Sequence, residues 1–356
     1  MVIQHAEQKY LPKLDDLLHS EFEEADNSNF LSPRNPMAIP SNNGRRSSLN
    51  GFRSTPPSSN FHDLYIFDQP RIVKMALDTQ SNIEWMPEYM EKLEEIGRGS
   101  FGTVHKCHDT KHKRFFVSKE INTRNFMHKD VAKNEIDILK DLNHPHIVSY
   151  HGAAINQDLI VIFLEYMSGS SLLQNLKQRG PLTEESVVKC SIQVAQGLEY
   201  IHSKDIVHID IKCENLLLDF NHDNVKICDF GCAIRKVSNG RIAYFDAFDA
   251  RIGVSAHWTA PEILTFEEFD QSADIWSAGC TIVEMLTCKP PYSRLSEDDV
   301  RASVEGRTLS YDPNDLIPSA SDSMKMLLTE LLQIERDKRL QSGSEVVQKF
   351  RDIFPQ

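Results

Sequence analysis

Apolar residues recur at helical spacing in the second half of the chain. Between residues 184 and 203, the apolar positions 187, 188, 192, 194, 195, 198 and 201 follow the 3.6-residue period of an α-helix. Residues 274–285 are apolar on nearly all sides, which indicates a helix buried at the centre of a domain. A shorter helix is predicted within residues 134–142, where positions 136, 138, 139 and 142 are apolar. The second half is therefore expected to be mostly helical.

The segments that precede these helices have the pattern of β-strands. Residues 103–107 and 115–121 are short runs with β-branched and aromatic side chains, and residues 93–96 could open another strand. Residues 159–167 begin with a continuous apolar run, which is typical of a buried strand. We therefore expect a strand-rich part with one helix, followed by a helical part, together spanning residues 90–354.

The first 89 residues have a different pattern. Within residues 1–26, Leu11, Leu14, Leu17, Leu18 and Phe22 recur at helical spacing among acidic residues, which predicts a short amphipathic helix. A helix with such an apolar stripe is more often transient, or packed within its own chain, than a docking site for a partner. Residues 27–60 hold eight Ser, seven Asn and five Pro, too few apolar groups to offset the entropy of ordering. We expect residues 27–89 to be a disordered regulatory tail and linker.

Composition and charge exclude several classes of protein. The chain has 356 residues, 40% of them hydrophobic and 26% charged, with a formal net charge of −13. An acidic balance argues against a nucleic-acid partner, which needs a basic face. No apolar run approaches the length of a membrane span, and the polar start lacks a signal-peptide core. Seven cysteines without paired zinc spacing suit a reducing compartment, so we expect a cytoplasmic protein, with the nucleus left open.

The strongest chemical signal lies between the two predicted long helices. Asp210, Lys212 and Asn215 are followed by Asp229-Phe230-Gly231. Phosphoryl transfer needs this set, because metals must neutralise the phosphates, a cation must sit on the transferred group, and a carboxylate must orient the attacking hydroxyl. In that scheme Asn215 and Asp229 hold Mg²⁺, Asp210 receives the hydroxyl proton, and Lys212 contacts the γ-phosphate.

A second signal lies upstream, in the strand-rich part. Gly97, Gly99 and Gly102 precede a predicted strand rather than a helix, so they cap a hairpin and could close over phosphates. Lys119 lies within the next predicted strand, and Glu135 falls on the predicted helix that follows. Each feature alone has a plainer explanation as a tight turn, a solvated lysine or a solvated glutamate. Their joint order is what excludes chance.

The whole series, completed by Ala260-Pro261-Glu262, resembles the eukaryotic protein kinases. The resemblance implies an α+β, bilobal fold with a small β-rich N-lobe carrying one helix and a larger helical C-lobe. It assigns catalysis to Asp210, Lys212, Lys119 and Glu135, and Mg²⁺ binding to Asn215 and Asp229. It assigns ATP binding to Ile96, Gly97, Gly99, Gly102, Val104, Lys119, Glu165, Met167, Leu217 and Cys228.

The resemblance also implies roles for residues around the site. Leu164 would be the gatekeeper, and Glu165 and Met167 would offer backbone groups to adenine. Asp274 would brace the backbone of the catalytic loop, and Arg339 would pair with Glu262. Ser255 would bridge Asp210 and Lys212, as a threonine does in Ser/Thr kinases.

The motifs further suggest which kinase this is. Lys212 is the choice of Ser/Thr kinases, and framework segments such as 144–152 resemble the MAP kinase kinase kinase branch. We therefore expect an ATP-dependent serine/threonine protein kinase in a MAP kinase cascade, with a protein substrate that could be a MAP kinase kinase and a regulator that binds the tail. The alternative is a weakly active pseudokinase that serves as a nucleotide-binding scaffold.

The chain departs from the family pattern directly before Asp210. Ile209 stands where kinases usually have an arginine that receives the phosphate of the activation loop. The loop between Asp229 and Glu262 has few hydroxyls, namely Ser238, Tyr244, Ser255 and Thr259. We therefore expect an activity that does not require phosphorylation of this loop.

Overall fold

The computed structural model describes residues 90–99, 102–124, 126–156, 158–235 and 254–354. The chain divides into two compact units, Met1–Gln80 and Ser81–Gln356. The predicted amphipathic helix and the tail lie outside the described residues, so both stay predictions. All described residues belong to the second unit.

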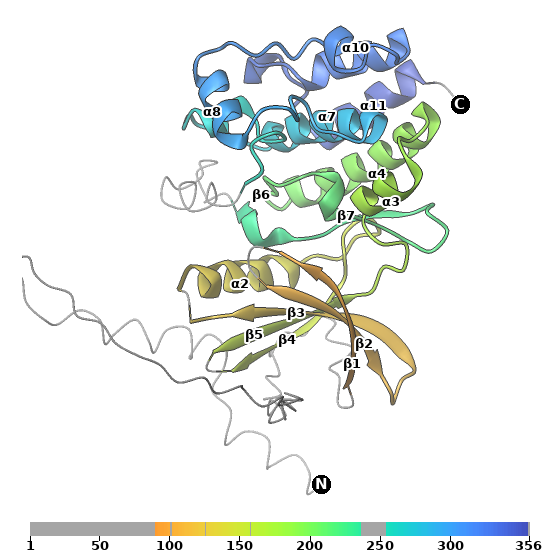
Figure 1. Cartoon of the computed structure of the whole chain (residues 1–356), viewed down its shortest axis with the longest axis vertical. Coiled ribbons are helices and arrows are strands. Elements are labelled where there is room, and N and C mark those ends of the chain that lie inside the picture. Colours follow the sequence, from red (N-terminus) through yellow and green to blue (C-terminus); the bar gives the residue numbers. More distant parts are fainter. Residues whose placement is uncertain (1–89, 100–101, 125, 157, 236–253, 355–356) are drawn as a thin grey trace, which may run out of the picture. The chain divides into compact units, whose positions relative to one another are not determined.

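The strand-rich part is one antiparallel sheet with a helix on one face (Figure 1). Its strands are β1 (Met90–Arg98), β2 (Thr103–Asp109), β3 (Arg114–Asn122), β4 (Tyr150–Asn156) and β5 (Leu159–Glu165), in the order β1-β2-β3-β5-β4. The helix α2 (Phe126–Leu139) follows β3 and contacts β3 and β5. The glycine-containing segment joins β1 to β2 as the predicted hairpin.

The second part is mainly helical. Its helices are α3 (Leu172–Arg179), α4 (Glu184–His202), α6 (Pro261–Leu264), α7 (Ser272–Thr287), α8 (Glu297–Glu305), α9 (Pro313–Leu316), α10 (Asp322–Leu331) and α11 (Gly343–Ile353). Three 3-10 turns, η1 (Cys213–Asn215), η2 (Phe230–Cys232) and η3 (Arg336–Lys338), lie among them. Two short ribbons pair β6 (Ile206–Val207) with β9 (Ile234–Arg235), and β7 (Leu216–Leu218) with β8 (Val225–Ile227).

Local sequence explains where the main helices begin and what they bury. The hydroxyl of Thr183 caps α4 by accepting the amide of Ser186, and Ser171 caps α3 in the same way. α7 is buried along most of its length, and Trp276 at its centre has no exposed surface. The helical core therefore forms around α7, with α4 and α10 packed against it.

Alternation along β3 divides the sheet into two faces. Val117, Lys119 and Ile121 share one face, and Lys119 contacts Glu135 on α2. Phe116 and Ser118 therefore point to the opposite face. The face toward α2 also lines the space between the sheet and the helical part, so it positions the site.

The α+β, two-lobed architecture expected from the sequence is confirmed. One helix was misplaced: α2 spans Phe126–Leu139, whereas the prediction was 134–142. Half of the residues in its first two turns are polar, which weakens the apolar period there. Leu142 is buried, but it lies in the turn that follows the helix and not in the helix itself.

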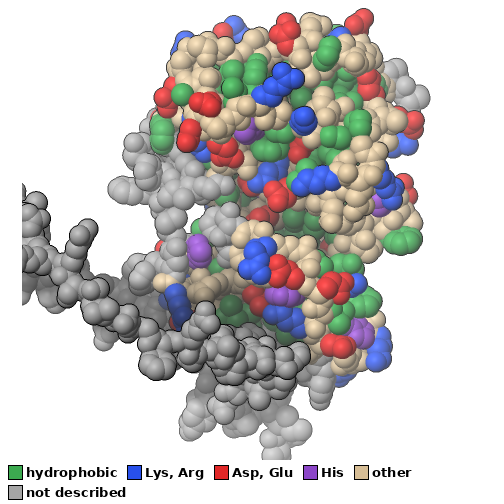
Figure 2. Space-filling view, in the orientation of Figure 1, with side chains coloured by type: hydrophobic (Ala, Val, Ile, Leu, Met, Phe, Trp, Pro, Cys, Tyr) green, Lys and Arg blue, Asp and Glu red, His purple; other side chains and the backbone are tan. Residues whose placement is uncertain are grey.

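Charged side chains of both signs are interspersed over the visible surface of both lobes (Figure 2). Within the described ranges, no helix combines the length and apolar character needed to cross a bilayer.

Candidate active site

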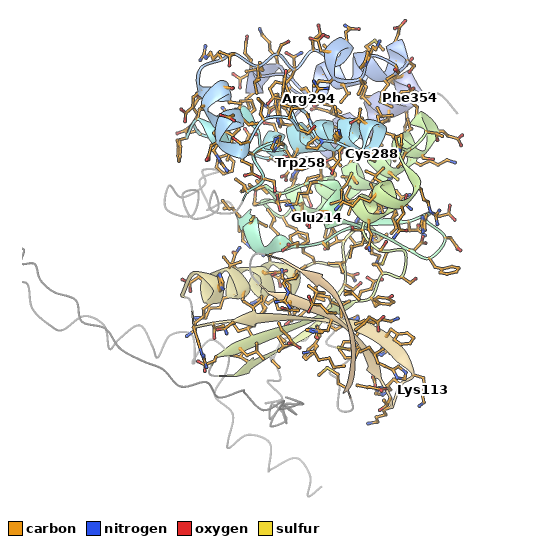
Figure 3. All side chains as sticks on the ribbon, in the orientation of Figure 1. Lys113, Glu214, Trp258, Cys288, Arg294 and Phe354 are labelled. Atoms are coloured by element: carbon orange, nitrogen blue, oxygen red, sulfur yellow. The ribbon has the colours of Figure 1, made fainter. Side chains whose placement is uncertain are left out.

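A cleft of about 630 Å³ lies between the sheet and the helical part. Its volume is within the usual range for pockets that bind small molecules. All of the residues that the sequence assigned to catalysis, metal binding and ATP binding line this cleft. Glu214, labelled in Figure 3, lines it from the helical side.

The glycine segment forms the edge of the cleft on the sheet side. The amide of Gly99 donates to the carbonyl of Gly102 at 2.9 Å, which closes the turn between β1 and β2. A Cβ on residue 102 would lie 2.3 Å from the carbonyl oxygen of Glu120. Only glycine permits this approach, so Gly102 holds the hairpin close to β3.

Lys119 on β3 connects the sheet, α2 and the Asp229 turn. Its Nζ lies 2.8 and 2.7 Å from the two carboxylate oxygens of Glu135, and 2.9 Å from Oδ1 of Asp229. Burial disfavours the ammonium, but the carboxylates of Asp229 and Glu135 outweigh it and raise the pKa of Lys119 above its ordinary value. A permanent positive charge is therefore held at the inner wall of the cleft.

Asp229 keeps its negative charge at neutral pH. Burial alone would raise the pKa of this carboxyl group, but the ammonium of Lys119 lowers it to about 2. Its backbone has a φ of 62°, in the left-handed region, where Asp is tolerated better than most residues. The turn at η2 thus presents an ionised carboxylate to the cleft.

Asp210, Lys212 and Asn215 face one another in the loop that ends at η1. Nζ of Lys212 lies 2.8 Å from Oδ2 of Asp210, and Nδ2 of Asn215 donates to the same oxygen at 2.9 Å. Lys212 also donates to Oγ of Ser255 at 2.8 Å. The hydroxyl of Ser255 therefore reaches the catalytic loop, as expected from the sequence.

The loop backbone is fixed by a carboxylate from the buried helix α7. Asp274 accepts the amides of His208 at 2.9 Å and Ile209 at 2.8 Å, and Nε2 of His202 lies 2.8 Å from the same side chain. This bracing stabilises a strained position, because Ile209 has a φ of 71°, which is rare for a β-branched residue. Asp274 thus sets the direction in which Asp210 points.

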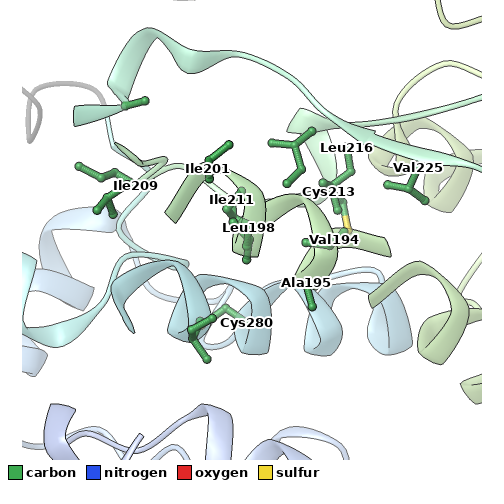
Figure 4. Close-up of a cluster of buried hydrophobic side chains, with 14 of the residues drawn as sticks. Val194, Ala195, Leu198, Ile201, Ile209, Ile211, Cys213, Leu216, Val225 and Cys280 are labelled. Carbon is green, nitrogen blue, oxygen red and sulfur yellow. The ribbon is translucent and has the colours of Figure 1, made fainter. Parts of the chain in front are cut away.

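Ile209 itself is a core residue. Its side chain is 3% exposed and belongs to the main apolar cluster, part of which is drawn in Figure 4. An arginine at position 209 would bring a charged group to this position. In this chain, position 209 belongs to an apolar cluster.

The donor set suits a hard divalent cation such as Mg²⁺. Nδ2 of Asn215 is committed to Asp210, so its amide oxygen is the atom available to a cation, beside the ionised Asp229. Among the residues that the structure describes, no group of three His, Cys, Asp or Glu side chains is arranged to hold a metal. This is consistent with Mg²⁺, which commonly takes one or two protein ligands and completes its shell with phosphate and water.

The strand β5 carries the cleft into the link between the two parts. Leu164 and Met167 line the cleft. The Glu165 carboxylate turns away from it and accepts bonds from Ser149 and Lys226 at 2.8 Å each. This leaves the backbone of residues 165–167 to face a ligand, as the sequence implied.

Cys228 lines the cleft directly before Asp229, as predicted. Burial and then the neighbouring Asp229 charge raise the pKa of the Cys228 thiol far above its ordinary value. The thiol is therefore a weak nucleophile here.

Sequence reasoning missed several residues of the cleft. Val117 and Val148 line it, and so do Glu214 and Cys232. A signal existed for Val117, because it stands two residues before Lys119 on the same strand and must share its face. Glu214 and Cys232 stand directly beside Asn215 and Gly231 in the two motifs, which was a second signal. Val148 lies outside those motifs and has no such signal.

Comparison with known proteins gives one family. The sequence profile described as Protein kinase domain matches residues 90–350, more than half of the chain. The matched residues include every side chain of the cleft discussed above.

Three similar proteins are all named as mitogen-activated protein kinase kinase kinases. Mitogen-activated protein kinase kinase kinase 3 of Mus musculus is 37% identical over 205 residues, covering 56% of this chain and 32% of that protein. Mitogen-activated protein kinase kinase kinase 1a of Physcomitrium patens is 33% identical over 278 residues, 75% of this chain and 35% of that protein. Mitogen-activated protein kinase kinase kinase 3 of Arabidopsis thaliana is 30% identical over 312 residues, which cover 82% of this chain and 44% of that protein. The chain thus spans less than half the length of these relatives.

Proposed function

The chain belongs to the protein kinase family, and from that premise we propose that it transfers the γ-phosphoryl group of ATP to a serine or threonine hydroxyl of a protein. The observation that carries the proposal is the meeting of Lys119, Glu135, Asp210, Asn215 and Asp229 around one cleft. These groups come from distant segments, and each has the chemistry that phosphoryl transfer requires.

Each side chain has a defined task in this proposal. Bound ATP supplies the phosphoryl group, and bound Mg²⁺ supplies charge that neutralises the phosphates. Lys119, oriented by Glu135, positions the phosphates, while Asp229 and the amide oxygen of Asn215 hold the cation. Lys212 and Asn215 hold the Asp210 carboxylate at Oδ2, and we assign to Oδ1 the proton of the attacking hydroxyl. Lys212 places positive charge next to the transferred group.

Serine/threonine specificity and a place in a MAP kinase cascade follow from two observations. Lys212 contacts both Asp210 and Ser255, the arrangement expected of Ser/Thr kinases. The names of the relatives then suggest a MAP kinase kinase as the protein substrate. No observation favours the pseudokinase alternative, because no catalytic side chain is missing.

Asp210→Asn tests the proposal. It should lower phosphate transfer from radiolabelled ATP to a generic basic protein by about 10²- to 10⁴-fold, the usual contribution of a positioned general base. Asp223→Asn, an exposed change on the β7–β8 loop, is the matched control and should retain wild-type transfer. An Asp210→Asn rate above about a tenth of wild type would overturn the role of Asp210, since loss of such a group costs far more.

Activity should not depend on phosphorylation of the activation loop. Ile209 is buried in an apolar cluster and offers no guanidinium to a phosphate. Two of the four loop hydroxyls are already engaged: Ser255 with Lys212, and Thr259 with the carbonyl of Ser255. The full chain carrying Ser238→Ala and Tyr244→Phe should therefore keep most of its transfer activity. Loss of most activity in this double variant would show that loop phosphorylation is required.

We further propose a cytoplasmic location and a regulator that binds the tail at residues 27–89. All seven cysteines are free, which suits a reducing compartment. Control through the tail fits a kinase whose loop lacks the usual phosphate-binding arginine.

A further inference from the structure

Lys106 on β2 lies over two aromatic rings that belong to different elements. Its Nζ is 4.7 Å from the centre of the Phe115 ring and 4.8 Å from the centre of the Tyr166 ring. At these distances an ammonium is attracted to the face of an aromatic ring. Oε1 of Glu94 on β1 lies 3.4 Å from the same nitrogen. We call these four residues the lysine clamp.

The register of the strands places the lysine clamp on the face of the sheet that lines the cleft. Lys106 pairs with Val117 on β3, and Val117 lines the cleft. Phe115 stands two residues before Val117, so its side chain is on the same face. Tyr166 directly follows β5 and itself lines the cleft. The clamp is therefore next to the cleft, although the side chains of Lys106 and Phe115 are not part of its wall.

The ammonium of Lys106 is held against the two rings. Lysine side chains at a protein surface usually extend their charged end into water. Here the Lys106 side chain is only 20% exposed, whereas that of its partner Glu94 is 60% exposed. The rings of Phe115 and Tyr166 are 6.2 Å apart, so one ammonium contacts both. A neutral side chain at position 106 would not gain this attraction.

The lysine clamp joins two parts of the protein that a nucleotide in the cleft must contact together. Lys106 and Glu94 belong to the β1–β2 hairpin, whose turn is closed between Gly99 and Gly102. Tyr166 belongs to residues 165–167, the link between the two lobes. The clamp therefore restrains the glycine turn relative to that link.

We propose that Lys106 is a positioning residue for ATP, which holds the glycine hairpin and the link between the lobes in the arrangement that binds the nucleotide. This inference rests on the proposed function, because it takes ATP as the ligand of the cleft. Apparent affinity is proportional to the fraction of molecules in the binding-competent arrangement. Loss of the clamp lowers that fraction, so more ATP is needed, whereas the rate at saturating ATP is kept.

The kinetic and binding constants for the nucleotide test the inference in the full chain. Lys106→Met should raise the KM for ATP and the Kd of MgADP by about five- to 30-fold, the effect of losing two partly exposed cation–π contacts. The value of kcat should change by less than about twofold, because the reacting groups are unaltered. Lys106→Arg keeps a cation over the rings, so both constants should stay within about twofold of wild type.

Two further variants provide the control and an independent test from the ring side. Lys92→Met should leave both constants unchanged, because Lys92 pairs with Cys107 and thus lies on the opposite face of the same strand pair. Phe115→Leu removes one ring and should raise the Kd of MgADP by about two- to fivefold. It should add little in combination with Lys106→Met, because both changes remove the same contact.

The outcomes separate this inference from the proposed function. An unchanged Kd of MgADP in Lys106→Met, beside a wild-type chain that transfers phosphate, would overturn the inference alone. A fall in kcat at an unchanged KM would also overturn it, and so would Lys106→Arg binding as weakly as Lys106→Met. If Lys106→Met does not fold, Lys106→Arg and Phe115→Leu decide by the same criteria. A wild-type chain that binds no MgADP would overturn the proposed function and the inference with it.

Discussion

Lys119→Met is expected to lower phosphoryl transfer by at least about 100-fold, the usual cost of removing a positioned electrostatic group. The ammonium of Lys119 joins Glu135 to Asp229 across the cleft, with all three contacts between 2.7 and 2.9 Å. Methionine fills similar space but supplies no charge to the phosphates. The two carboxylates then also lose their common partner.

Transfer should be measured with radiolabelled ATP, beside a thermal melt that reports folding. Lys92→Met is the matched control, because Lys92 pairs with Glu120 on the same sheet but 42% of its side chain is exposed. Exposed pairs of this kind contribute about 0–1 kcal/mol to stability, and Lys92 lies outside the cleft. A Lys119→Met chain that keeps more than about a tenth of wild-type transfer would contradict the role of Lys119.

Arg339→Met is expected to lower the free energy of unfolding by about 3–5 kcal/mol, the usual cost of breaking a buried ion pair from one side. Nη1 and Nη2 of Arg339 donate to the two carboxylate oxygens of Glu262 at 2.7 and 3.0 Å. Arg339 also donates to the carbonyls of Ser272 and Gln333, and its guanidinium lies over the Trp276 ring. The substitution removes this donor from the buried Glu262 carboxylate and from the carbonyls of Ser272 and Gln333.

Urea unfolding at neutral pH measures the effect. Lys338→Met provides the contrast, because the adjacent Lys338–Glu335 pair is exposed by 64% and 70% and should contribute less than about 1 kcal/mol. Equal losses in the two variants would show that burial does not decide the contribution of the Arg339 pair.

The pattern of residues along the sequence predicted the individual helices and strands better than it predicted the contacts between them. Residue composition located β3, the 3.6-residue period located α4, and a nearly continuous apolar run located α7, because each signal depends on neighbours in sequence. The start of α2 was missed, since half of the residues in its first two turns are polar. The apolar cluster of Cys107, Phe116 and Phe163 was also missed, because its members stand on three separate strands.

The candidate site was predictable only through the order of its motifs. The Lys119–Glu135 pair and the contact of Ser255 with Lys212 were expected, and both contacts are present. The direct contact between Lys119 and Asp229 was not expected, because the two residues are 110 positions apart. Contacts over such separations depend on how the lobes pack, which residue spacing does not encode.

Ile209 has a consequence for how this sequence can change over time. A single change to the arginine that most kinases have at this position would place a cation where the native side chain is 3% exposed and surrounded by apolar groups. Such a cation is costly without a partner, and the partner would be a loop phosphate that this chain has few hydroxyls to carry. An arginine is therefore tolerated only with a phosphate on the loop, for which the sequence offers Ser238 and Tyr244 besides the engaged Ser255 and Thr259. Whether position 209 can change thus depends on whether the loop is phosphorylated.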